Sequence, residues 1–271
     1  MSPRNLMLAM FLTPALASAQ VAPASPPVIQ DNSFLMEEAY NQETGIVQHI
    51  FTLLIHRGTS DFEGAFTQEW PVGSITHQLS YDLPLVRSEG ESGLGDIRIN
   101  YRYQLLGSGD TRVAVAPRFS VTLPTGDWKK GRGSGSVGFE TMLPVSYVIS
   151  PVFTTHSNVG ANYNPSARNE TGARANSFGL TLGQSLILTA SNIIQPLVEM
   201  VYAGEQSVVA EEKTDWSDDF VISPGVRVAF NFKSGLQIVP GIAVPIGVGP
   251  SRGDRGLFFY LSFEHPFIRS Q

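Results

Sequence analysis

The stretch LFFYLSFEHPF, residues 257–267, decides how the rest of the chain is interpreted. Side chains alternate across a β-strand, so every second residue shares a face. One face of this stretch is apolar except for His265, and the other face mixes apolar and polar residues. The apolar face holds Leu257, Phe259, Leu261, Phe263 and Phe267, and the mixed face holds Phe258, Tyr260, Ser262, Glu264 and Pro266.

This aromatic strand lies almost at the C-terminus, which is typical of the closing strand of an outer-membrane β-barrel. Bacterial machinery that assembles such barrels reads a C-terminal strand of this kind. We therefore expect residues 257–267 to be recognised by it. Residues 268–271 follow the last aromatic residue, whereas the usual signal ends on that residue.

The first nineteen residues predict export from the cytoplasm. Arg4 precedes an apolar run over residues 6–16, and the run is followed by Ala17, Ser18 and Ala19. This is the pattern of a secretory signal peptide, residues 1–19, cut before residue 20. A buried N-terminal helix is the alternative, and Pro14 disfavours it.

Composition narrows the class of the exported chain. No later stretch approaches the roughly 18 consecutive apolar residues of a membrane-spanning helix. The chain has no cysteine, so it does not rely on disulfides. Without Arg4, 17 basic against 24 acidic residues leave a formal charge of −7, which argues against nucleic-acid binding. A soluble β protein or a single membrane barrel fits these features.

Residues 20–44 form a leader before the barrel region, 45–271. Residues 20–32 are small, polar and Pro-rich, which indicates a flexible segment. Residues 33–43 predict a short helix, with Ser33 as its cap and Glu37 and Glu38 in its first turn. We expect this helix to plug the barrel or cross its periplasmic mouth, and a frayed periplasmic tail is the alternative.

From residue 45 onward, alternation predicts an all-β, closed antiparallel transmembrane barrel of about twelve strands. In the clearest stretch, Ile97, Ile99 and Tyr101 alternate with Arg98 and Asn100. The predicted strands are 45–55, 61–70, 75–83, 96–106, 111–123, 136–147, 152–163, 176–190, 194–205, 219–231, 235–246 and 256–267.

The connections after the second strand alternate between short and long. Such barrels have tight periplasmic turns and longer extracellular loops, so both termini are expected in the periplasm. The long connections are predicted at 84–95, 124–135, 164–175, 206–218 and 247–255. With this alignment, aromatic residues gather at both ends of the strands, as interfacial belts do.

Charge assigns the two faces of each strand. An arginine that faces lipid at mid-membrane costs about 2–4 kcal/mol, so charged residues with the polar parity of their strands are expected in the lumen. The predicted lumen residues are Arg98, Arg102, Arg112, Arg118, Arg227, Asp82, Glu140, Glu199, Glu264 and His156.

This set supports two readings. In the first, Arg98, Arg102, Arg112 and Arg118 form a basic ladder on one inner wall that faces carboxylates on other walls. Such a ladder would orient a polar or anionic solute in a conduit. In the second, the charges form an ion-pair network that fills a narrow barrel and transmits nothing. Twelve strands lie between the filled eight-stranded and the open sixteen-stranded barrels.

Several segments together resemble the outer-membrane family named for the meta-cleavage pathway of phenol degradation. The resemblance implies a barrel that passes small solutes, among them hydrophobic or aromatic compounds, and it gives no residue a known role. The resembling segments, besides the final strand, are EEAYNQE (37–43), FTQEWP (66–71), HQLSY (77–81), GLGDIRINYRYQ (93–104), LPTGD (123–127) and IVPGIAVPIGVGP (238–250).

The sequence gives only weak indications of catalysis, lipopolysaccharide binding or metal binding. His156 and Ser157 are neighbours on one strand and point to opposite faces, which disfavours a hydrolase pair. Residues 128–132 (WKKGR) are expected either to contact phosphates of lipopolysaccharide or to form a solvated loop. The acidic residues of 211–219 do not match a calcium loop. The expected partners are thus outer-membrane lipids, lipopolysaccharide and a small solute, with no cofactor, no metal and no enzymatic activity.

Overall fold

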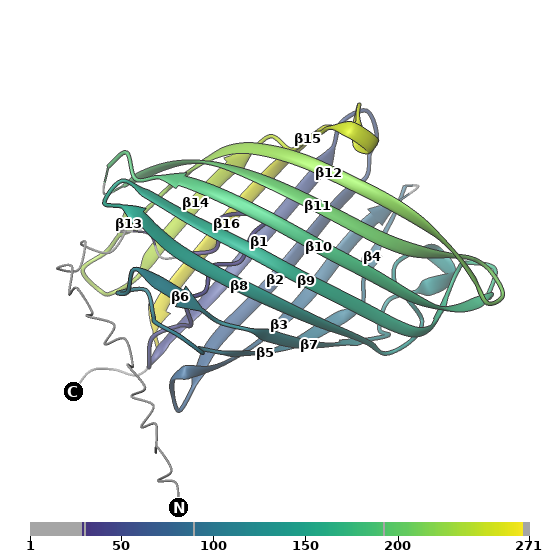
Figure 1. The fold of residues 1–271 in the computed structure, drawn as a ribbon, viewed down its shortest axis with the longest axis horizontal. Helices are drawn as coiled ribbons and strands as arrows, with labels where there is room; N and C mark the ends of the chain where they lie inside the picture. The colour runs from purple at the N-terminus through teal and green to yellow at the C-terminus, as the bar shows by residue number, and fades with distance from the viewer. Residues whose placement is uncertain (1–28, 30, 89, 192, 268–271) are drawn as a thin grey trace, which may run out of the picture.

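The computed structural model describes residues 29, 31–88, 90–191 and 193–267. The predicted signal peptide, residues 20–28 and 30 of the leader, and residues 268–271 lie outside this part. Within it, the strand segments form one antiparallel barrel of twelve strands, as predicted (Figure 1). The segments are β1 (Ile46–His56), β2 (Phe62–Val72), β3 (Ser74–Ser88), β4 (Glu91–Leu94), β5 (Ile97–Tyr103), β6 (Val113–Val115), β7 (Arg118–Leu123), β8 (Gly138–Ser150), β9 (Phe153–Arg168), β10 (Arg174–Leu188), β11 (Ile194–Ala210), β12 (Lys213–Val228), β13 (Phe230–Asn231), β14 (Gln237–Ala243), β15 (Ile246–Gly247) and β16 (Gly256–Pro266).

The barrel closes where the chain ends. β16 pairs antiparallel with β1 over its whole length, from Ile46 opposite Pro266 to His56 opposite Gly256. On its other edge β16 pairs with β14, and β14 pairs with β12. The C-terminal stretch is therefore the closing strand, as its sequence predicted. Short turns of such barrels face the periplasm, so the end that holds the start of β1 and the end of β16 is called the periplasmic end.

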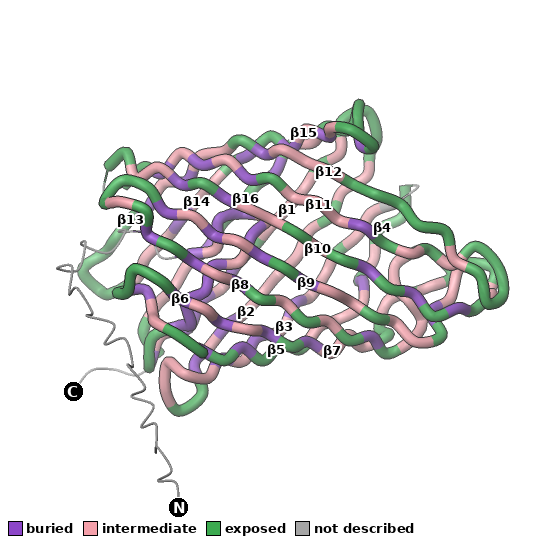
Figure 2. Tube along the Cα trace, viewed as in Figure 1, coloured by how far each residue is buried: buried purple, intermediate pink, exposed green. Residues whose placement is uncertain are grey.

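Alternating burial confirms the predicted faces of the strands (Figure 2). On β5, Ile99 is 48% exposed, whereas its neighbour Asn100 is 3% exposed. On β16, Phe258 and Tyr260 are buried, and Leu257 and Phe259 are exposed. The outer surface of the barrel is thus apolar and the inner surface polar, while the closed sheet satisfies the backbone hydrogen bonds that lipid would leave unpaired. In the described ranges, no helix is long and apolar enough to cross a membrane.

Three of the predicted long loops are instead mostly strand, and in the first of them β3 continues to Ser88 and pairs with β4. β9 and β10 continue to Arg168 and from Arg174, and β11 and β12 continue to Ala210 and from Lys213. Cross-strand pairing persists through most of these hairpins, for example between Gln206 and Trp216. Their polar residues were interpreted as loop, but a strand that rises beyond the membrane needs no apolar face.

The predicted helix over residues 33–43 is wrong. These residues form bends and irregular chain. A helix satisfies its own backbone groups, whereas here side chains of the barrel wall bind the backbone. Because these side chains come from β3, β5, β8, β9, β11 and β12, the segment lies inside the barrel. Residues 31–43 are called the plug segment below.

Candidate functional site

The barrel wall holds the plug segment through its backbone N–H groups. The Glu199 carboxylate on β11 accepts bonds at Oε1 from the N–H groups of Phe34, Leu35 and Met36, at 2.8, 2.9 and 3.1 Å. Further along the plug segment, wall side chains accept one N–H each. These pairs are Glu37 with Asn158, Ala39 with Ser146, Asn41 with Gln104, and Gln42 with Gln78.

Two buried arginines bind the carbonyl groups of the same segment. Arg102 on β5 donates to the carbonyls of Glu38 and Tyr40, at 3.2 and 2.9 Å. Arg227 on β12 donates to the carbonyl of Asp31 at 2.7 Å. Both side chains are almost fully buried, with Arg102 3% and Arg227 1% exposed. The wall thus binds the plug segment as a groove binds an extended peptide.

The plug segment also packs on the seam where the barrel closes. The ring of Phe34 lies 5.7 Å from that of Phe258 and 5.3 Å from that of Tyr260, centroid to centroid. A Cβ atom at Gly241 would come within 2.4 Å of the Phe34 ring, so glycine makes room for it. Asp31 accepts bonds from Tyr260 and from Gln48, and so it joins β16 to β1.

The plug segment divides the lumen into an open and a filled half. On the extracellular side lie a cavity of about 290 Å³, called the outer cavity, and a second cavity of about 200 Å³. Both are lined by Glu37, Arg98 and Arg118. On the periplasmic side, the space beside His156 and Arg227 is only about 10 Å³.

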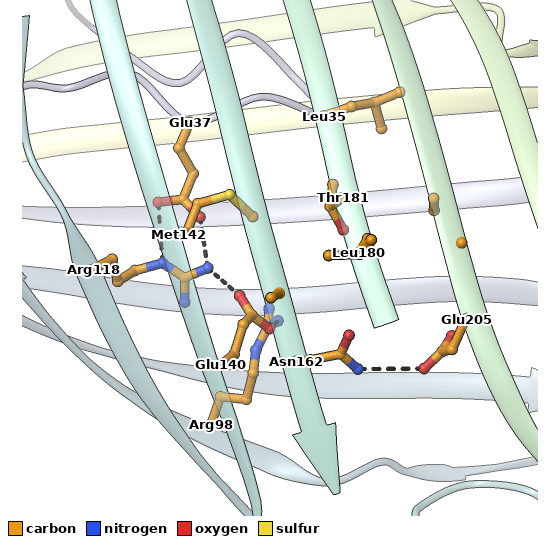
Figure 3. A pocket seen from close by; sticks show the side chains of 13 residues that line it. Leu35, Glu37, Arg98, Arg118, Glu140, Met142, Asn162, Leu180, Thr181 and Glu205 are labelled. Carbon is orange, nitrogen blue, oxygen red and sulfur yellow. Dashed lines mark hydrogen bonds and ion pairs between the residues drawn. The ribbon is translucent and has the colours of Figure 1, made fainter. Parts of the chain in front are cut away.

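Between the two larger cavities lies a cluster of ion pairs, called the charge junction (Figure 3). Arg118 binds Glu37 through two nitrogens, at 2.8 and 3.1 Å, and it also binds Glu140. Arg98 bridges Glu140 and Asp82, at 2.9 and 3.1 Å. The Glu37 side chain remains 24% exposed and that of Arg98 38%, so water reaches both from the cavities.

The structure brings together part of the predicted lumen set. Arg98, Arg118, Asp82 and Glu140 meet at the charge junction, and Arg102 borders it through Glu37 and Glu69, at 3.8 and 3.5 Å. The expected transverse field does not form. Glu140 lies beside the arginines rather than opposite them. Glu199 and Arg227 bind the plug segment, and Glu264 forms no ion pair with any other residue that the structure describes.

The prediction that Arg112 faces the lumen is wrong. Its side chain donates at 2.8 Å to the hydroxyl of Tyr147, and its guanidinium lies 5.2 Å from the centre of that ring. Tyr147 points outward, because its neighbour Ser146 on β8 is fully buried. Arg112 immediately precedes β6, so the alternation that fixes direction within a strand does not govern it.

His156 helps to hold the plug segment in place. Its Nδ1 lies 2.7 Å from the Ser146 hydroxyl, and that hydroxyl accepts the N–H of Ala39. The hydroxyl proton can therefore bond Nδ1, and the pair supports the plug segment. His156 is 1% exposed and lies edge-on to Tyr40, so a substrate has no access to the pair in this arrangement.

Sequence reasoning missed two functional carboxylates, Glu37 and Glu69. Glu69 shares the inward parity of Thr67 on β2, so alternation alone was a sufficient signal. Glu37 was assigned to the first turn of a helix, and its sequence carries no signal for a partner 81 positions away.

Comparison with known proteins identifies the family. The family described as "Putative MetA-pathway of phenol degradation" matches residues 32–252, and the chain belongs to it. A search of curated proteins found no match. The family match includes most of the plug segment and the whole charge junction, so both lie within the region that defines membership.

Among solved structures, the chain is similar to the COG4313 outer membrane channel from Pseudomonas putida F1. The identity is 12% and the TM-score 0.57, over 84% of this chain and 98% of that one. An anion-selective porin from Comamonas acidovorans is 8% identical, with a TM-score of 0.35 over 82% of this chain and 98% of the porin, which is too low to carry an argument. The first similarity supports the fold. The closed barrel and its apolar outer surface place the chain in the outer membrane.

Proposed function

We propose that this member of the phenol-degradation family is an outer-membrane channel for small solutes, among them aromatic or hydrophobic compounds. The observation that carries the proposal is the outer cavity of about 290 Å³, which water reaches and the charge junction lines. A barrel built only for structure has no need of a hydrated, ionised cavity of this size. Pockets for small molecules begin near this volume.

Passage to the periplasm requires the plug segment to move or to leave a narrow path beside it. Apart from its chain connection to β1, hydrogen bonds, ion pairs and packing hold the segment, and no covalent crosslink joins it to the wall. Such contacts can be exchanged with water one at a time. The segment therefore has the properties of a removable closure.

The alternative is a structural or surface-interaction barrel with a filled lumen. The space of about 10 Å³ in the periplasmic half favours it. The two functions differ in one measurable respect, because a filled barrel conducts no ions whether or not the plug segment is free.

A reversible crosslink tests the proposal. The Ser146 hydroxyl lies 2.8 Å from the Ala39 nitrogen, so cysteines at these two positions are adjacent, and the chain has no other cysteine. We expect oxidation of Ala39→Cys/Ser146→Cys to lower conductance in planar bilayers by about ten-fold, and reduction to restore it, because the crosslink fixes the closure. Liposome swelling with aromatic solutes is expected to follow the same pattern.

The single variant Ala39→Cys is the matched control and should not respond to oxidation. Equal, non-zero conductance in both redox states would show that solutes pass without movement of the plug segment. Silence of the wild type and of both redox states would overturn the channel and support the filled barrel.

A further inference from the structure

At the charge junction, the plug segment occupies the barrel wall as a ligand would, because the Glu37 carboxylate belongs to the plug segment and its partner Arg118 belongs to the wall. Arg118 binds this carboxylate through Nε and Nη2, at 3.1 and 2.8 Å. This two-nitrogen contact is the arrangement by which arginine recognises carboxylates specifically. The wall therefore contains a carboxylate site that an internal carboxylate occupies.

We propose that this site binds small monocarboxylates with a compact apolar body, which take the place of the Glu37 side chain on Arg118. The inference deepens the proposed function and rests on it, because it names a solute class for the same lumen. The remaining contacts at the charge junction, the space beside it and the anchoring of Glu37 all support the exchange.

The position of the site allows a solute to reach it. Glu37 and Arg118 line both cavities, and the larger is also lined by Met142, Ala161 and Ala203. Figure 3 shows Met142 beside the Glu37–Arg118 contact. A one-ring carboxylate fits within about 290 Å³, with its carboxylate on Arg118 and its ring beside the Met142 thioether, which contacts aromatic rings favourably.

The backbone of Glu37 can stay in place while its side chain leaves. The Asn158 side chain accepts the Glu37 N–H and donates to the Glu37 carbonyl, both at 2.8 Å. The exchange thus needs only rotation of a side chain that is 24% exposed. The incoming carboxylate takes the place of the Glu37 carboxylate on Arg118, so the buried guanidinium keeps a counter-ion, while the displaced Glu37 carboxylate stays charged in the hydrated cavity.

Calorimetric titration of the detergent-solubilised barrel tests the site, with benzoate as the probe and neutral benzamide as its shape-matched control. We expect benzoate to bind the wild type at least ten-fold more tightly than benzamide. In Glu37→Gln the internal competitor is neutral, and benzoate affinity should rise about ten-fold, because the competent site is no longer occupied.

Glu205→Gln is the matched control for the general field of the lumen. Glu205 lines the outer cavity, and its carboxylate accepts a hydrogen bond from Asn162 rather than from an arginine. Its loss should change benzoate affinity by less than about two-fold, since it does not compete for Arg118. Arg118→Lys keeps the charge and removes the paired nitrogens, and we expect it to lower benzoate affinity about ten-fold. Arg112→Lys, outside the lumen, should leave the affinity unchanged.

Equal affinity for benzoate and benzamide would overturn the site. Equal gains in Glu37→Gln and Glu205→Gln would replace it with a general field effect. Heat-modifiable gel migration of each variant reports whether the barrel is folded, so a lost signal is assigned to binding only in a folded protein. The titration does not depend on conductance. A silent bilayer recording would overturn the proposed channel function, whereas only the titration decides whether the carboxylate site exists.

Discussion

Two arginines on one strand, β5, lie in different halves of the lumen. Arg98 keeps 38% of its side chain exposed and faces cavities of about 290 and 200 Å³. Arg102, four residues nearer the periplasmic end, keeps 3% exposed and binds plug-segment carbonyls. The same residue type on the same face is thus a solvated wall charge in one half and a buried structural clamp in the other.

The plug segment produces this difference. In the periplasmic half it excludes water, so every charge there must find a fixed partner or pay the cost of desolvation. In the extracellular half water remains, and ion pairs can open and exchange. The strands of the wall alternate between inward and outward residues in the same way in both halves. The sequence of the wall therefore does not show which inward charges are open to a solute and which only hold the plug segment.

The largest expected difference between the two halves is in the free energy of unfolding that is lost when Arg102 or Arg98 is replaced. Arg102→Met leaves two plug-segment carbonyls without their donor and buried Glu69 without its cationic partner, so we expect it to lower the free energy of unfolding by about 3–5 kcal/mol. Arg98→Met should cost less, about 1–2 kcal/mol, since Asp82 keeps Thr67 and Asn100 as donors and Glu140 keeps Arg118. Chemical denaturation of protein folded in lipid vesicles measures both values. Equal costs would show that water does not distinguish the two halves.

The contrast also explains which features the sequence predicted. Strand number, closure and face followed from alternation, because lipid on one side of the wall penalises every misplaced charge. Arg98, Arg102, Arg118 and Asp82 were assigned to the lumen on this basis. The role of each residue depends on the path of the plug segment. That path is set by contacts between residues far apart in the sequence, such as Phe34 and Glu199, which are 165 positions apart.

Local rules misled where tertiary contacts override them. Ser33 and Glu37 suit a helix start, but wall side chains satisfy the backbone of this segment and remove the advantage of a helix. Arg112 has the inward parity of its stretch, yet it lies before β6 begins and stacks outside on Tyr147. Parity predicts direction only within a paired strand.

An added charge should report the free space in each half. Thr181 and Ser185 lie four residues apart on the inward face of β10, the first beside the outer cavity and the second fully buried. Ser185→Arg forces a long charged side chain into a filled region, and we expect a cost of about 2–4 kcal/mol. Thr181→Arg should cost less than about 1 kcal/mol, because its guanidinium reaches water. Denaturant midpoints of the two variants, measured under one condition, make the comparison. A well-tolerated Ser185→Arg would mean that the periplasmic half has room that the structure does not contain.

The smallest expected effect concerns the hold of Glu199 on the plug segment. Three N–H groups converge on one carboxylate oxygen, and such bonds are roughly twice as strong when the acceptor is charged. Glu199→Gln keeps an acceptor oxygen of the same shape and removes the charge, so the segment should be released more often by about 1.4 kcal/mol, which corresponds to a ten-fold change.

Thiol labelling measures this release without relying on conductance. Ala39 is fully buried in the plug segment, and Ala39→Cys supplies a unique thiol because the chain has no cysteine. Labelling by a small maleimide requires the segment to leave its site, so in the Glu199→Gln background we expect labelling about ten-fold faster. In a Glu205→Gln background the rate should stay the same, since the Glu205 carboxylate binds Asn162 of the wall rather than the plug segment. Unchanged labelling in Glu199→Gln would show that Arg102 and Arg227 hold the segment without help from the carboxylate. The division of the lumen would then depend on the carbonyl contacts alone.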